Sequence, residues 1–163
     1  MSNTVNGLLN IIPWVIVALA LWLNPKIAAK YGKETAFIVG PALFGAVCLV
    51  LSVYVPGNGM RFALLCGAAA GIFCGQPVLW SLPSKFLTGA SAAAGFAAIN
   101  SVGNLGGFIA QNLVPWIRDV TGSTIAPMLF LAACLTAGAL MTFVVQAAIR
   151  RRHGSIPYTA PAT

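Results

Sequence analysis

Charge is what this sequence has least of. Only 7% of its 163 residues are charged, the acidic ones are Glu34 and Asp119, and the single histidine is His153. The sequence contains no pair of neighbouring carboxylates, no His/Cys cluster at metal-ligand spacing and no glycine-rich phosphate loop. The four cysteines lie singly in apolar stretches, where small buried side chains are the usual role. We therefore expect no enzyme, no metal site and no cofactor.

Long apolar runs dominate the sequence, which has 59% hydrophobic residues and a mean hydropathy of +0.90. A helix needs roughly 20 mostly apolar residues to cross a bilayer. Five stretches reach about that length: residues 5–23, 35–55, 60–83, 92–116 and 125–149. Because lipid offers no partner for backbone groups, such runs must be helical. The sequence predicts an all-α integral membrane protein with five transmembrane helices, a domain over residues 1–152, and lipid as its main partner.

The cations predict how these spans are oriented. Five spans place the termini on opposite sides of the membrane. The C-terminal side receives Lys26, Lys30, Lys33, Lys85, Arg150, Arg151 and Arg152, and the other side receives Arg61 and Arg118. The side richer in Lys and Arg is cytoplasmic in most membrane proteins. We expect a cytoplasmic C-terminus, with a disordered polar tail at 153–163. The net charge of +7 then reflects orientation rather than nucleic-acid binding.

The N-terminus predicts that something is missing. Residues 1–3 carry no charged side chain, and the first span begins almost at once. A secretory signal would have a basic start and a cleavage site of small residues. A chain that begins outside without such a signal looks like the remainder of a longer protein.

Small residues predict where helices pack closely. Gly67, Gly71 and Gly75 are spaced four apart, so they share one face of the third span, and Gly103 and Gly107 repeat the pattern in the fourth. Helices in lipid associate through such stripes, where their backbones can approach. A smooth glycine surface would also let helices slide.

Amide side chains in the spans predict a polar interior. Asn100, Asn104 and Gln111 lie within about 40° of one another on a helical wheel. Similar stripes give the full set of candidate pathway residues: Asn6, Asn10, Trp14, Gln76, Trp80, Asn100, Asn104 and Gln111. Amides in lipid either bond neighbouring helices or face a wet cavity, and both interpretations stay open. Pro77 and Pro83 predict a bend or break in the third span near its cytoplasmic end.

The fourth span and the loop before it carry a longer motif. The pattern W-x-L-P-x-x-[FL]-L-x-G, followed by AA-G-x-A-x-x-N-x-x-G-N-x-G-G-F, is matched at Trp80, Leu82, Pro83, Phe86, Leu87, Gly89, Gly95, Asn100, Gly103, Asn104, Gly106, Gly107 and Phe108. It resembles helices ten and eleven of the major facilitator superfamily, in particular its anion:cation symporter family of tartrate, phthalate and sugar-acid carriers. The first interspan loop also resembles that family's at Lys26, Lys30 and Gly32, although the acidic position falls on Ala29.

The resemblance implies helices eight to twelve of a twelve-helix carrier in a bacterial cytoplasmic membrane. Such a carrier takes up a small organic anion with protons, by rocking one half against the other. The missing N-terminal half would then be a partner. Two other readings remain open, namely a truncated fragment that does not transport and a small oligomeric pore or scaffold.

Overall fold

The computed structural model describes residues 3–83 and 89–153, and the secondary structure in this part of the chain is helical. The helices are α1 (Asn3–Tyr31), α2 (Glu34–Tyr54), α3 (Asn58–Cys74), α4 (Gln76–Ser81), α5 (Ala90–Thr121) and α6 (Ile125–His153). Five helical stretches are long and apolar enough to cross a membrane, with α3 and α4 forming one of them. The predicted all-α membrane fold with five spans is confirmed. The predicted tail lies almost wholly outside the described residues.

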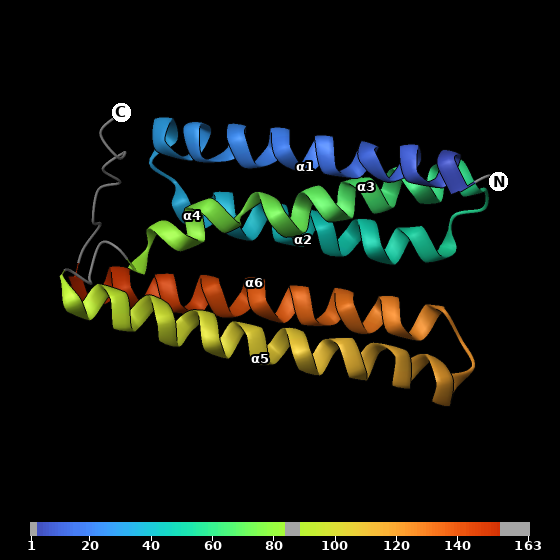
Figure 1. Ribbon diagram of the computed structural model, residues 1–163. Coiled ribbons are helices and arrows are strands. Elements are labelled where there is room, and N and C mark those ends of the chain that lie inside the picture. Colours follow the sequence, from blue (N-terminus) through green and yellow to red (C-terminus); the bar gives the residue numbers. More distant parts are fainter. Residues whose placement is uncertain (1–2, 84–88, 154–163) are drawn as a thin grey trace.

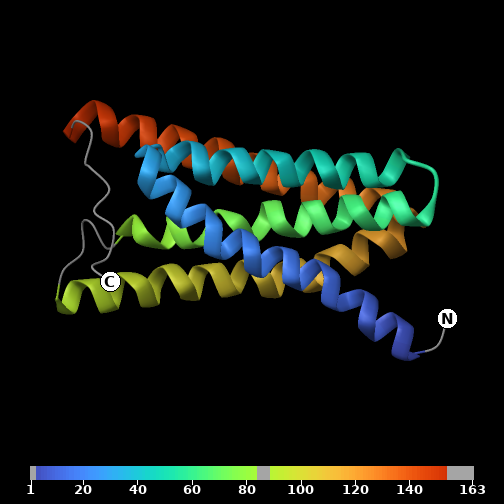
Figure 2. The ribbon, with the colours of Figure 1, turned by 90° about the horizontal axis from the view of Figure 1, so that it is seen from above.

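Helix α2 is the centre of the bundle (Figure 1). It packs against α3 on one side and α6 on the other, while α1 lies on α3 and α5 runs along α6. Seen from above, α1 crosses the other helices obliquely (Figure 2). The α2/α6 contact therefore joins a group of α1, α2 and α3 to a pair of α5 and α6. The buried core around α2 joins residues of α2, α3 and α6, namely Ala46, Cys48, Leu49, Ala68 and Ala132.

Glycine brings α2 and α3 into backbone contact. A Cβ atom added at Gly71 would lie 2.6 Å from the Cα and N of Gly45 and from the carbonyl oxygen of Pro41. At Gly67 it would lie 3.1 Å from Cys48 Sγ, and at Gly75 it would lie 3.3 Å from backbone atoms of α2. All three glycines of the stripe thus face α2. The closest approach, at Gly71, leaves no room for any side chain.

The glycines of α5 have different surroundings. A Cβ atom added at Gly103 or Gly107 would meet no described atom within 4 Å. Among the described residues, these two positions therefore pack against no other helix. Their role in helix packing stays a prediction about a partner of α5.

The third span is interrupted at Gly75, between α3 and α4. Pro77 causes this locally, because its nitrogen has no proton to continue the helical hydrogen bonds and its ring crowds the preceding turn. The helix resumes with a bond from the Leu79 N–H to the Gly75 carbonyl at 2.9 Å. The interruption lies where the prolines predicted it, and α4 leaves the line of α3 towards α5 (Figure 1).

Asn24, which sequence reasoning passed over, ties α1 to both neighbours. Its side chain is 5% exposed, and its Nδ2 donates to the carbonyl oxygens of Phe37 at 3.0 Å and Cys74 at 2.6 Å. Both acceptors lack a helical donor: Pro41 cannot supply an N–H to Phe37, and Cys74 is the last residue of α3. One amide thus satisfies two carbonyls that the prolines and the break expose.

The first connection is shorter than the sequence predicted. Lys26 and Lys30, expected in a loop, lie in the last two turns of α1. The helix continues because Ala28 is fully buried beside α2 and α4, and the Lys26 ammonium turns back over the Trp22 ring at 3.6 Å. Gly32 ends α1 with φ +63° and donates its N–H to the Ala28 carbonyl at 2.9 Å, as a left-handed helix cap does. The loop assignment of these two lysines is wrong, while Gly32 lies at the turn.

Candidate amide-lined pocket

A pocket of about 660 Å³ lies between α4, α5 and α6. Its walls are Gln76, Leu79, Trp80, Leu82, Pro83, Ile99, Asn100, Gly103, Asn104, Val145 and Gln146. The break at Gly75 contributes to the pocket because it sets α4 off from α3 and towards α5. The pocket is thus built from three segments that are distant in the sequence.

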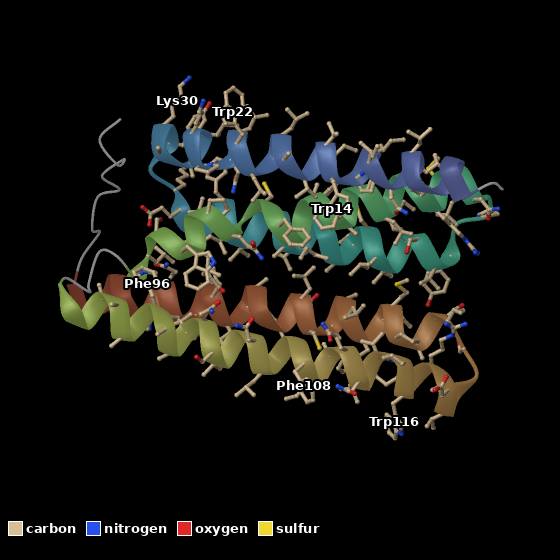
Figure 3. The ribbon with its side chains drawn as sticks, viewed as in Figure 1. Trp14, Trp22, Lys30, Phe96, Phe108 and Trp116 are labelled. Carbon is tan, nitrogen blue, oxygen red and sulfur yellow. The ribbon has the colours of Figure 1, made fainter. Side chains whose placement is uncertain are left out.

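Four of the predicted pathway residues share this pocket. Asn100 and Asn104 stand one turn apart on α5, and Gln76 and Trp80 stand one turn apart on α4. The rings of Trp80 and Phe96 lie 5.9 Å apart between centroids, which joins α4 to α5 beside the amides (Figure 3 labels Phe96). The glycine at position 103 keeps the α5 wall open, since a Cβ atom there would project into unoccupied space.

Gln146 is a further amide in the pocket, and it comes from α6. Gln146 is absent from the candidate pathway residues, because one glutamine in an apolar run gives no periodic signal. The remaining signal was the cost of placing any amide in lipid. With Gln146 included, amides from three helices surround one space.

The pocket has a mostly apolar lining in which the polar side chains are uncharged amides. No Lys, Arg, Asp, Glu or His is among the described residues that line it. Each primary amide offers two N–H donors and a carbonyl acceptor, and the indole of Trp80 offers one N–H donor beside a flat apolar face. Such walls can form hydrogen bonds to carboxylate oxygens. They supply neither a counter-charge nor a titratable proton carrier.

The stripe of α1 lies elsewhere. Asn10 and Trp14 line a second groove of about 400 Å³ between α1 and α3, where the Trp14 ring lies 5.7 Å from the ring of Phe73. Figure 3 shows Trp14 directed towards α3. The candidate pathway residues of α1 therefore line a different groove from those of α4 and α5. The side chain of Asn6 lies outside the described residues.

Gln111 continues the α5 stripe but is not a wall of either groove. Its side chain is exposed, two turns beyond Asn104. Further along the same helix, Phe108 and Trp116 are 67% and 60% exposed and point away from the bundle (Figure 3). Much of α5 thus faces lipid or a helix outside this chain.

Comparison with curated proteins gives the relationship. The chain is 35% identical over 96% of its length to the Agrobacterium vitis protein named "Putative tartrate transporter". It is 34% identical over 90% to the Acinetobacter baumannii "Quinolone resistance transporter", and 33% identical over 83% to the Escherichia coli "Inner membrane transport protein RhmT". The chain belongs to the major facilitator superfamily. The family prediction is confirmed.

The match covers only part of these carriers. The aligned region spans 36%, 34% and 31% of the three relatives, so the chain corresponds to about a third of each. No protein-family model matches it, and no solved structure does. Since the relatives are transporters and the chain has five apolar spans, it is a multi-pass membrane protein of a transporter family.

Proposed function

We propose that the chain forms the last five helices of a carrier that moves a small organic anion across a bacterial cytoplasmic membrane, together with protons. The rest of the carrier supplies the other helices, and the C-terminus of this chain lies in the cytoplasm. Transport proceeds by alternating access, with the two halves rocking about a site near the middle of the bilayer. The named relatives and the unequal distribution of cations support this proposal.

The observation that carries the proposal is the gathering of Gln76, Trp80, Asn100 and Asn104 in one pocket. If the amides served only to bond neighbouring helices, they would point into helix contacts. Instead, Gln76, Asn100 and Asn104 are exposed side chains on the walls of a space that could hold a small ligand. The α5 amides also border a helix face that the described chain leaves uncovered, where the other half of the carrier would close the pocket.

Amide walls suit an anion that receives its counter-charge elsewhere. An amide N–H can donate to a carboxylate without the cost of burying a second charge. The cation that balances the anion, and the group that carries the proton, would then lie in the missing helices. The anion site is therefore complete only when the amides of this chain and the charged groups of the other helices are both present.

The proposal is tested in a carrier rebuilt from this chain and its N-terminal helices. Replacing Asn104 or Gln76 by Ala removes a hydrogen bond to a charged group, worth about 1.5–3 kcal/mol. The apparent affinity for tartrate or another accepted carboxylate should therefore fall by roughly tenfold or more. Helical content and thermal stability should change little.

Asn112→Ala is the matched control. Its amide is exposed on the same helix, two turns from Asn104, and donates to the Phe108 carbonyl of its own helix at 2.8 Å. We expect its affinity to match that of the unaltered carrier. Loss of stability with unchanged affinity in the Asn104 and Gln76 variants would show that these amides are structural. Uptake by this chain alone would favour an oligomeric pore instead.

A further inference from the structure

A third groove, distinct from the amide-lined pocket and from the α1/α3 groove, runs between the start of α2 and the end of α6. It has a volume of about 520 Å³, and its apolar walls include Val39, Gly40, Phe143 and Ala147. Phe143 is 55% exposed, and an added Cβ atom at Gly40 would meet nothing within 4 Å, so the groove is open to its surroundings. In a membrane protein, such a groove on the outer surface lies against acyl chains.

Cations stand at the end of this groove. Lys33, just before α2, is one of its walls. Arg151 lines an adjoining hollow that shares Phe143 and Ala147 with the groove. Residues 143, 147 and 151 are spaced four apart, so Arg151 lies one turn beyond the apolar wall on the same face of α6.

The balance of charge at this end is positive. Glu34, which follows Lys33, is the acidic side chain of this end among the described residues. Lys30 lies at the same end of the bundle, on the last turn of α1 (Figure 3). Basic residues around a pocket between transmembrane helices recognise anionic lipid headgroups, and an apolar groove beside them receives an acyl chain.

We propose that this groove is a binding site for an anionic phospholipid. One acyl chain lies along the α2/α6 groove, against Val39, Gly40 and Phe143. The headgroup phosphate lies between Lys33 and Arg151. The lipid would brace the contact by which α2 holds the α5–α6 pair, independently of what the carrier transports.

Direct lipid binding to the purified chain tests the site. Native mass spectrometry in detergent would compare phosphatidylglycerol with phosphatidylcholine of the same chain length. We expect the anionic lipid to bind at least tenfold more tightly. Lys33→Gln and Arg151→Gln should each weaken the binding of the anionic lipid about fivefold, which is roughly the contribution of one cation near a lipid surface. Arg118→Gln, which removes an exposed cation from the end of α5, should have no effect.

A second pair of variants tests the acyl chain. Gly40→Leu places a side chain in the groove, and Gly138→Leu places the same side chain on α6 at a position where an added Cβ atom also meets nothing. Only Gly40→Leu should reduce phosphatidylglycerol binding, with helical content unchanged in both. Equal binding of the two lipids, an equal effect of Arg118→Gln, or full competition by inorganic phosphate at matched concentration would overturn the proposal.

Discussion

Replacing Gly71 by alanine should do more damage than its single methyl group suggests. The new Cβ would lie 2.6 Å from three backbone atoms of α2, whereas ordinary van der Waals contacts lie at 3.4–4 Å. Backbone cannot rotate away as a side chain can, so the two helices must separate by about 1 Å. That separation loosens the rest of the α2/α3 contact and the core beside it.

Overpacking of this kind costs about 1–3 kcal/mol, and we expect the upper half of that range because every clashing atom is backbone. Gly45→Ala approaches the same contact from α2 at 3.2 Å and should cost less. Gly138→Ala, where an added Cβ meets nothing, should be neutral or slightly stabilising, since alanine is the better helix former by up to about 1 kcal/mol.

Unfolding of the purified chain in mixed micelles, followed by helical circular dichroism, would rank the three variants. The expected order of destabilisation is Gly71, then Gly45, then Gly138. If Gly71→Ala proves as stable as Gly138→Ala, then α2 and α3 do not meet along this glycine stripe, and the central helix contact of the fold is misplaced.

Two further predictions concern the hydrogen bonds of Asn24 and the membrane topology. Asn24→Leu should lower the unfolding free energy by about 1–2 kcal/mol, because it removes the donor to two carbonyls that no helical N–H reaches. Asn112→Leu, which loses a bond within its own helix, is the control in the same micelle assay. Equal losses in the two variants would show that the bonds of Asn24 between helices contribute no more than a bond within one helix. A reporter fused after Arg152 should be active in the cytoplasm and one inserted within Pro56–Gly59 should be active outside; the reverse pattern at either site would invert or break the proposed topology.

The spans and the α4–α5 wall were predictable because each depends on a local signal. Long apolar runs define the spans, and a spacing of four places Asn100 beside Asn104 and Gln76 beside Trp80. Pro77 marked the interruption between α3 and α4. The two pairs share one pocket because the interrupted span and α5 are joined by a short connection and so become neighbours.

What the sequence could not give is which neighbour each face meets. Trp14 lies on a stripe as regular as that of α5, yet it packs against Phe73 in a separate groove. Gln146 and Asn24 are single amides without periodicity. Gln146 shares its pocket with Gln76 and Asn104, and Asn24 bonds the carbonyl of Cys74, 50 positions away. The prediction of a loop at Lys26 was wrong because charge near the end of a span suggests a loop. The aliphatic part of the Lys26 side chain can instead lie along the helix and hold the ammonium over the Trp22 ring.

The central claim is that the amide pocket between α4, α5 and α6 is part of the substrate pathway. Its most direct test is thiol labelling in the rebuilt carrier, after replacing the exposed native Cys134 by serine. Cysteine placed at Asn104 or Gln76 should react with a polar thiol reagent, and an accepted carboxylate should block that reaction. Cysteine at Asn112 should react equally with and without substrate. If the first two positions are inaccessible, or are labelled at the same rate when substrate is bound, the pocket is not the pathway.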